Sequence, residues 1–307
     1  MVAPTGEQFE ISGAGYRAVV TEGGATLRLL EHDGREIVSG FAEDAMPPVG
    51  RGQLLMPWPN RIRDGHYSFG GHQDLQLGLT EPSRSNASHG LVRWAAWSLE
   101  EHSSASVSLT YRLMAQSGYP WTLDLHVLYD VSADGLTVTQ TATNLSPTAA
   151  PFASGAHPYV RVGRGLVDHS ELTVPASVRL ITDDRLIPVD EEKVDGTPYD
   201  FRVSRPVRDT VLDHAFGDLD RDPRGIATVT LRDPATGDGV ALWMDDTHRW
   251  IQVFSAELDP TPRLALAVEP MTSPPDAFRS GRDLVVLSPA GTDGDEFSGS
   301  WGIRSLA

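Results

Sequence analysis

Cysteine is absent from this 307-residue sequence, and lysine occurs only once, as Lys193. The lack of cysteine excludes disulfide scaffolds, thiolate metal sites, iron–sulfur clusters and cysteine nucleophiles. Schiff-base and pyridoxal chemistry would require Lys193 to be buried with a depressed pKa, and this residue lies in the acidic stretch 191–195. We therefore expect an activity that needs neither a thiol nor an amine.

Positive charge is scarce, because 25 basic residues face 42 acidic ones and the formal net charge is −17. A chain of this charge repels phosphate backbones and anionic membrane surfaces, so nucleic acid and membrane are not expected as partners. The amino terminus has no basic region followed by an apolar one, and no segment approaches eighteen consecutive apolar residues. We expect a soluble, cytoplasmic protein, and small-molecule ligands remain open.

Helical periodicity is also missing, so helices should be short and few. Alternation with a period of two is the commonest pattern, and turn residues recur every eight to twelve positions, as in all-β proteins. The strands predicted in this way cover residues 25–30, 107–113, 123–131, 136–138, 229–232, 240–244, 250–254 and 264–268. Hairpin turns are expected at 33–34, 70–71 and 236–239.

No low-complexity linker, internal repeat or shift in composition divides the chain. Residues 1–307 are therefore predicted to form a single domain, a large antiparallel β-sandwich with a hydrophobic content of 40%. A wide concave sheet of such a sandwich is a common place to hold a sugar-sized ligand.

Two motifs could indicate a cofactor site or a metal site, but both are better explained as ordinary turns and loops. Residues 13–18 match the dinucleotide fingerprint, but a strand-like segment follows them instead of the helix that would hold a pyrophosphate. His66 and His72 frame a turn, and their spacing fits no familiar metal-ligand pattern. Neither a cofactor nor a metal is expected.

A locally basic segment stands out in this acidic chain. Two prolines and a tryptophan precede Asn60 and Arg61, and prolines hold a neighbouring polar side chain in a fixed orientation. His89 follows within the motif Ser88-His89-Gly90. The arginines of this region indicate a site, although solvated arginines on a loop explain them about equally well; they are Arg51, Arg61, Arg63, Arg84 and Arg93.

Two further segments combine a polar side chain with small neighbours. If residues 152–159 form a strand, His157 shares one face with Ala153 and Gly155, which leaves space beside the imidazole. In the strand 264–269, Glu269 shares a face with alanines and closes the strand in a position suited to a base, or else is a solvated charge. Asp213 interrupts an apolar run, where a turn residue is an equal alternative.

Together these segments resemble the aldose 1-epimerase (galactose mutarotase) family. The resemblance spans about residues 50–290, and its specificity lies in the order and spacing of short motifs. These motifs are Asn60-Arg61-Ile62 with the hairpin 67–71, Ser88-His89-Gly90, Gly118-Tyr119-Pro120, Ala156-His157-Pro158-Tyr159, Leu212-Asp213-His214-Ala215-Phe216 and Val268-Glu269-Pro270-Met271-Thr272 with Pro275-Asp276-Ala277. The segment 287–292 departs from the Pro-Gly-Glu ending of better-matching members.

The resemblance implies a supersandwich fold and a cofactor-independent isomerase that interconverts the α and β anomers of a hexose. It implies Glu269 as the general base and His157 as the general acid. Arg61, His89 and Asp213 are implied as the residues that hold the sugar hydroxyls and ring oxygen. The implied partner is a monosaccharide, and the protein is expected to be a monomer or a homodimer.

Three alternatives to a hexose mutarotase remain. The family also includes epimerases of hexose 6-phosphates, and the arginines of residues 51–93 are able to bind a phosphate through their bidentate forks. A carbohydrate-binding protein without catalysis would keep the same fold, although it would need neither an acid nor a base. A glycoside hydrolase or lyase would use two carboxylates, such as Asp213 and Glu269, as an acid/base pair.

Overall fold

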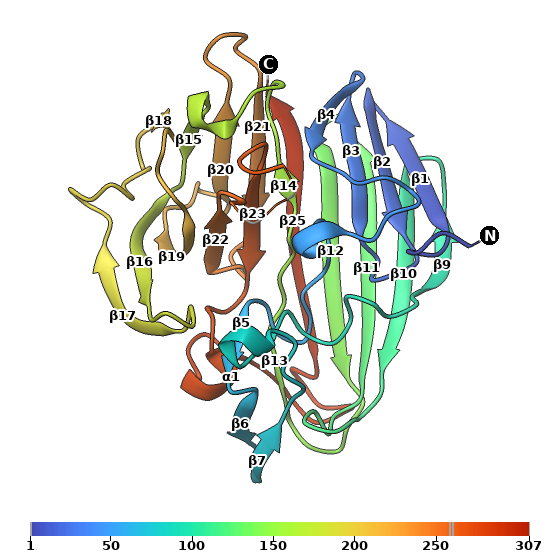
Figure 1. Cartoon of the computed structure of the whole chain (residues 1–307). Coiled ribbons are helices and arrows are strands. Elements are labelled where there is room, and N and C mark those ends of the chain that lie inside the picture. Colours follow the sequence, from blue (N-terminus) through green and yellow to red (C-terminus); the bar gives the residue numbers. More distant parts are fainter. Residues whose placement is uncertain (1, 258, 260, 307) are drawn as a thin grey trace.

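Two large antiparallel β-sheets, packed against each other, make up most of the computed structural model, which describes residues 2–257, 259 and 261–306 (Figure 1). The all-β prediction is confirmed. In sheet order, the ten-stranded sheet consists of β1 (Gln8–Gly13), β2 (Tyr16–Thr21), β3 (Leu27–His32), β4 (Arg35–Val38), β14 (Tyr159–Val160), β23 (Leu266–Met271), β22 (Trp250–Phe254), β19 (Asp213–Leu219), β16 (Ala176–Thr182) and β17 (Pro188–Lys193).

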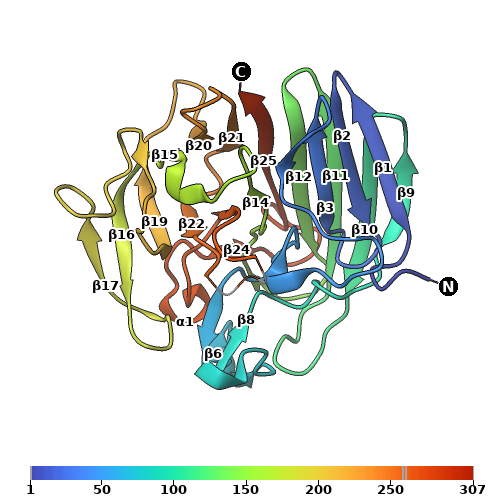
Figure 2. The same cartoon turned by 45° about the horizontal axis from the view of Figure 1, so that its top comes forward.

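The second large sheet has nine strands among the described residues. In sheet order they are β18 (Arg205–Pro206), β15 (Glu171–Thr173), β20 (Ala227–Arg232), β21 (Gly239–Met244), β25 (Glu296–Leu306), β12 (Gly135–Asn144), β11 (Leu123–Ser132), β10 (Ser106–Leu113) and β9 (Ser98–His102). Both views place β1, β2 and β3 against β10, β11 and β12 (Figure 2).

Short elements complete the structure. The two-stranded sheets pair β5 (Arg61–Arg63) with β8 (Asn86–Ser88), β6 (His66–Phe69) with β7 (His72–Gln76), and β13 (Ala150–Phe152) with β24 (Val285–Leu287). The helices are α1 (Ala277–Ser280) and the 3₁₀ turns η1 (Pro48–Gly50), η2 (Pro82–Arg84) and η3 (Val167–His169). Within the described residues, no helix has the length and apolar character needed to span a bilayer.

Alternating side chains of the two sheets form the main core. Along β11 the residues alternate between buried and half-exposed, as the period of two in its sequence predicts. Tyr129 of β11 is fully buried, and its hydroxyl donates a 2.6 Å hydrogen bond to the carbonyl of Ala25 beside the other sheet. The core therefore ties the two sheets together by packing and by a buried hydrogen bond.

The strand expected over residues 152–159 is interrupted. β13 ends at Phe152 and β14 begins at Tyr159. Between them the backbone hydrogen-bonds to an irregular loop, where the His157 N–H donates to Gln53 O at 3.0 Å and the Gly52 N–H donates to His157 O at 2.9 Å. These bonds take the place of a strand ladder, and they fix the backbone of His157 without regular strand geometry.

The strand expected over residues 264–269 is shifted along the chain. β23 begins at Leu266 and continues past Glu269 to Met271, because β22 pairs with it from Ala267 to Met271. Glu269 consequently lies inside a strand in the middle of the sheet, not at a strand end as its sequence position suggested. Leu266 and Val268 join the main core as expected.

Candidate active site

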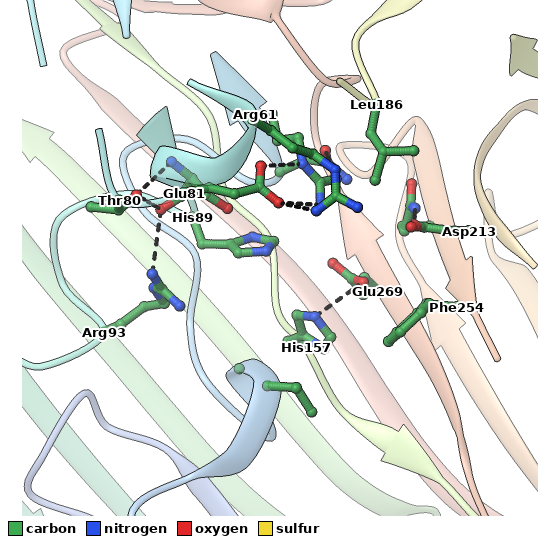
Figure 3. A pocket seen from close by; sticks show the side chains of 16 residues that line it. Arg61, Thr80, Glu81, His89, Arg93, His157, Leu186, Asp213, Phe254 and Glu269 are labelled. Atoms are coloured by element: carbon green, nitrogen blue, oxygen red, sulfur yellow. Dashed lines mark hydrogen bonds and ion pairs between the residues drawn. The ribbon is translucent and has the colours of Figure 1, made fainter. Parts of the chain in front are cut away.

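One cavity brings together all five site residues expected from the sequence. It has a volume of about 260 Å³ and opens to solvent. Figure 3 shows side chains from both halves of the chain converging on it. The residues that line it are Val49, Gly50, Asn60, Arg61, Thr80, Glu81, Arg84, Ser88, His89, Arg93, His157, Leu186, Asp213, Gln252, Phe254 and Glu269.

His157 and Glu269 form a buried pair in this cavity. His157 Nε2 lies 3.3 Å from Glu269 Oε1, and the two side chains are only 6% and 3% exposed (Figure 3). The imidazole stacks on the Tyr159 ring with 5.1 Å between ring centroids and 11° between the planes. Stacking and burial together restrict the imidazole to one orientation toward the carboxylate.

A glycine provides the space that the imidazole occupies. Gly50 has a φ of +79°, and a Cβ built on it would lie 3.1 Å from His157 Cδ2. Both the positive φ and the close approach would strain an ordinary side chain here. The turn η1 is therefore part of the wall that holds His157.

Asp213 enters the cavity from β19, two strands away from Glu269 in the same sheet. Between them, Gln252 of β22 is directly opposite Glu269 in the strand register. The Gln252 amide donates a 2.6 Å hydrogen bond to Asp213 Oδ1. Gln252 thus positions Asp213, and it is a site residue that the sequence did not single out.

Arg61 is held by a carboxylate on the loop that follows β7. Its guanidinium donates two hydrogen bonds to Glu81, from Nε to Oε2 at 2.8 Å and from Nη2 to Oε1 at 3.0 Å. Arg84 of η2 also donates to Glu81 Oε1, at 3.0 Å. This bidentate pairing fixes the plane of the Arg61 fork at the cavity wall.

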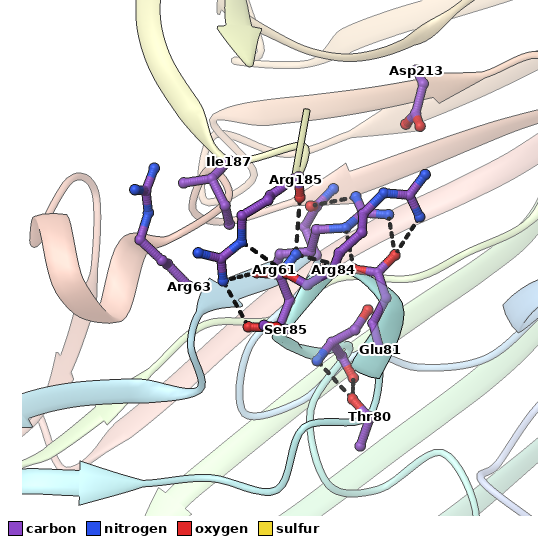
Figure 4. Close-up of polar contacts among 12 residues, drawn as sticks. Arg61, Arg63, Thr80, Glu81, Arg84, Ser85, Arg185, Ile187 and Asp213 are labelled. Carbon is purple, nitrogen blue, oxygen red and sulfur yellow. Dashed lines mark hydrogen bonds and ion pairs between the residues drawn. The ribbon is translucent and has the colours of Figure 1, made fainter. Parts of the chain in front are cut away.

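A hairpin turn from the other half of the chain is tied to this arginine cluster (Figure 4). Arg185, in the turn between β16 and β17, donates hydrogen bonds to the carbonyls of Arg84 and Ser85, each at 2.8 Å. The Asn86 amide donates to Arg185 O at 2.9 Å in return. These bonds place the neighbouring Leu186 as an apolar wall of the cavity.

His89 lies beside His157, with 5.4 Å between the ring centroids and 70° between the ring planes. Four buried polar atoms of cavity residues have no hydrogen-bond partner in the described part of the chain: His89 Nδ1, His157 Nδ1, Gln252 Oε1 and Glu269 Oε2. Unpartnered buried polar atoms are rare in native proteins and call for a partner. Hydroxyl groups suit both kinds of atom, because they donate and accept.

Burial pushes both members of the central pair toward neutrality. It lowers the pKa of His157, and the positive charge of Arg93 lowers it further. Burial also raises the pKa of Glu269 well above its ordinary value, and the nearby Asp213 carboxylate adds to this rise. The result is a pair that holds one shared proton over a wide pH range, either as imidazolium with carboxylate or as imidazole with carboxylic acid.

Such a pair is able to transfer protons in both directions. One member accepts a proton from a bound molecule while the other donates one, and the reverse transfer restores the starting state. The two groups act on neighbouring atoms of one ligand, because their reacting atoms are 3.3 Å apart. The cavity therefore fits concerted acid/base chemistry on a small polyhydroxylated molecule.

One family model and two curated relatives match most of the chain. A family model described as "Aldose 1-epimerase" matches residues 7–292. The chain is 34% identical over 284 residues to the uncharacterized Escherichia coli protein YihR, covering 92% of this chain and 89% of the relative. It is 23% identical over 291 residues to the uncharacterized protein YphB of the same organism, covering 89% and 95%.

Solved structures show the same fold. A GalM/aldose epimerase homologue from C. elegans superimposes with a TM-score of 0.85 at 20% identity, covering 98% of each chain. A galactose 1-epimerase from Lactobacillus acidophilus gives a TM-score of 0.79 at 18% identity, covering 96% of this chain and 92% of that one. The predicted galactose mutarotase-like sandwich is thereby confirmed.

Proposed function

Because the chain belongs to the aldose 1-epimerase family, we propose that it is a cofactor-independent isomerase that interconverts the α and β anomers of an aldose by acid/base ring opening and reclosure. The observation that carries this proposal is the buried His157–Glu269 pair, with 3.3 Å between Nε2 and Oε1 at the wall of a sugar-sized cavity. A binding protein has no need for an acid and a base that act on neighbouring atoms.

Ring opening uses both members of the pair. The Glu269 carboxylate takes the proton from the C1 hydroxyl while the His157 imidazolium donates its proton to the ring oxygen O5. The C1–O5 bond breaks, and the open chain carries an aldehyde at C1 and a hydroxyl at C5. Each proton transfer contributes roughly 10²–10⁴-fold to the rate when the group lies within hydrogen-bonding distance.

Reclosure reverses the same two transfers. After rotation about the C1–C2 bond, the C5 hydroxyl attacks the opposite face of the aldehyde, His157 accepts the hydroxyl proton, and Glu269 returns a proton to the carbonyl oxygen. The pair holds one proton throughout: as imidazolium with carboxylate beside the ring form, and as imidazole with carboxylic acid beside the open chain. Burial favours the neutral pair of imidazole and carboxylic acid, because it lowers the pKa of His157 and raises the pKa of Glu269. This environment therefore favours the transfer of both protons that opens the ring.

The other expected site residues bind the sugar. Arg61 donates to a sugar hydroxyl from the part of its fork that Glu81 leaves open, Asp213 accepts from one, and His89 supplies an unpartnered ring nitrogen beside His157. The unpartnered Gln252 Oε1 accepts from a further hydroxyl. Positioning of this kind aligns C1 and O5 with the pair.

The direct test follows freshly dissolved α-glucose and α-galactose by polarimetry, with and without the protein. The proposal predicts that the protein accelerates the approach to anomeric equilibrium over buffer alone. Calorimetric binding without acceleration would identify a carbohydrate-binding protein instead. Release of reducing sugar from oligosaccharides would identify a glycoside hydrolase that uses Asp213 and Glu269 as its carboxylates.

A further inference from the structure

Backbone strain is concentrated at the wall of the cavity. Four of the 16 lining residues are non-glycine residues with a left-handed backbone: Val49 with a φ of 44°, Asn60 with 53°, His89 with 61° and Leu186 with 59°. Only a few per cent of non-glycine residues adopt this conformation, and asparagine and histidine are enriched among them. Such strain persists where the surrounding structure enforces it, and it gathers at active sites and ligand clamps.

Leu186 lies in the hairpin turn between β16 and β17. A turn that required only this backbone shape would carry glycine or asparagine at the left-handed position. Leucine is strained there, and its side chain provides four apolar carbons at the cavity wall. The side chain of Leu186, and not the shape of the turn, is therefore the feature that needs an explanation.

Hydrogen bonds fix the backbone of this turn. The Leu186 N–H donates to Asp183 O at 2.9 Å, and Asp183 Oδ1 accepts from the N–H groups of Arg185 and Ile187 at 2.9 and 3.0 Å. The Asn86 amide donates to Arg185 O at 2.9 Å, which holds the peptide group that precedes Leu186. Leu186 consequently faces the cavity from a backbone that is fixed on both sides.

The proposed mechanism sets which carbons of the sugar lie near Leu186. Glu269 acts on the C1 hydroxyl and His157 acts on O5, so C2 and C3 follow C1 on the side of Glu269 that is away from His157. Figure 3 shows Leu186 and Asp213 on this side, beyond Glu269 as seen from His157. C6 is attached beyond O5 and lies on the opposite side. The wall that C2 and C3 meet therefore includes Leu186 and Asp213.

This end of the cavity combines polar and apolar walls. Asp213 accepts hydroxyl protons, and Arg61 is the strongest opposite charge that acts on it. A hydroxyl group is small and is able to bond to both residues. The side chain of Leu186 offers no hydrogen bond, so a longer substituent would meet its carbons without gaining a polar contact. Such a wall limits the size of what C2 and C3 carry.

We propose that Leu186 is a specificity-determining residue, which restricts the substrate to aldoses that carry a hydroxyl group and nothing larger on C2 and C3. This inference rests on the proposed function, because the orientation of the sugar follows from the roles of His157 and Glu269. The wall excludes 2-acetamido sugars and 3-O-alkyl sugars. A misfit of this kind in an apolar pocket is worth about tenfold or more in kcat/KM.

The test compares kcat/KM for N-acetylglucosamine and for 3-O-methylglucose with that for glucose, by polarimetry and proton NMR. We expect the wild-type protein to favour glucose over each of them by about tenfold or more. Leu186→Gly removes the wall and suits the left-handed backbone, so the variant should fold as the wild type does. At least one of the two ratios should then shift toward the larger sugar by about tenfold or more. The sugar that gains identifies the carbon that faces Leu186.

Two variants and one further sugar serve as controls. Leu186→Asn relieves the strain but keeps the bulk, because asparagine tolerates the left-handed region and has as many side-chain heavy atoms as leucine; it should keep the wild-type preference. Ala14→Gly relieves a φ of 50° in the exposed turn between β1 and β2, and it should leave both ratios unchanged. The ratio of 6-O-methylglucose to glucose should be the same in Leu186→Gly as in the wild type, since C6 lies on the His157 side.

The outcomes separate this inference from the proposed function. Unchanged ratios in Leu186→Gly would overturn the inference, as would a wild-type protein that accepts both larger sugars as readily as glucose. An equal gain for 6-O-methylglucose would show a general loosening of the cavity and would overturn it too. Acceleration of glucose in any of these cases would leave the proposed function standing, whereas no acceleration of any sugar would overturn both.

Discussion

The Gln252 amide donates a 2.6 Å hydrogen bond to Asp213 Oδ1, and the same residue is opposite Glu269 in the strand register. One side chain on β22 thereby links a carboxylate expected to bind the sugar with the strand that carries the base. The hydrogen bond also helps to keep Asp213 ionised, since it opposes the rise in pKa that burial causes.

Gln252→Leu tests this linkage. The substitution removes the hydrogen bond to Asp213, and a hydrogen bond to a charged group is worth about 1.5–3 kcal/mol. We expect kcat/KM to fall roughly 10- to 100-fold, mainly through a higher KM, because Asp213 binds the sugar and moves no proton in the mechanism. Steady-state polarimetry measures both constants. The control Gln116→Leu replaces an exposed glutamine, and equal effects of the two substitutions would contradict the role of Gln252.

Gly50→Ala tests the space reserved for the imidazole. An alanine at a positive φ costs about 1 kcal/mol of folding free energy. Here the new Cβ would also lie 3.1 Å from His157 Cδ2. Gly237 is a matched control, since its φ is +80° and a Cβ on it meets no atom within 4 Å. Chemical denaturation should show that Gly50→Ala is destabilised at least as much as Gly237→Ala, and only Gly50→Ala should lose about tenfold or more in kcat. Equal activity of the two would show that the approach of Gly50 to His157 is unimportant.

The pH profile tests the shared proton. Catalysis requires the pair to hold one proton. Below the lower pKa the pair binds a second proton, and above the higher pKa it loses the one that it holds. With ordinary values of 6.5 for His157 and 4.5 for Glu269, the rate would fall about tenfold per pH unit above 6.5. The lowered pKa of His157 and the raised pKa of Glu269 instead widen the one-proton range across neutrality. After subtraction of buffer catalysis, kcat/KM at pH about 7.5 should be within about twofold of its value at pH about 6; a tenfold fall between them would contradict the account.

The sandwich was predictable because its strands show the alternation of apolar and polar residues in their own local sequence. β11 alternates in burial as it does in sequence. The segment 153–158 was mispredicted as a strand for a physical reason: its backbone hydrogen bonds are divided between residues 52–57 and residues 268–272, which no local pattern reveals. Glu269 was placed at a strand end because Pro270 suggested a stop, yet β22 extends the pairing beyond it.

The site was only partly predictable. Residue types and small neighbours indicated that His157 and Glu269 have room around them, but their convergence came from the family resemblance, since they lie on different segments far apart in the chain. Gln252 and Glu81 gave no signal, because a polar residue inside a strand and an acidic residue in a loop are ordinary in sequence.

The measurement that tests the central claim most directly is anomer exchange in Glu269→Gln and His157→Asn, followed by polarimetry and proton NMR. The account predicts that each variant folds, as shown by an unchanged circular dichroism spectrum, and loses at least about 100-fold in kcat because one of the two proton transfers is missing. The matched controls are Glu100→Gln and His126→Asn, which alter a partly exposed His–Glu pair, with 3.0 Å between Nε2 and Oε2, on the outer face of the second sheet; both should keep wild-type rates. A near-wild-type rate in either Glu269→Gln or His157→Asn would contradict the assignment of acid and base.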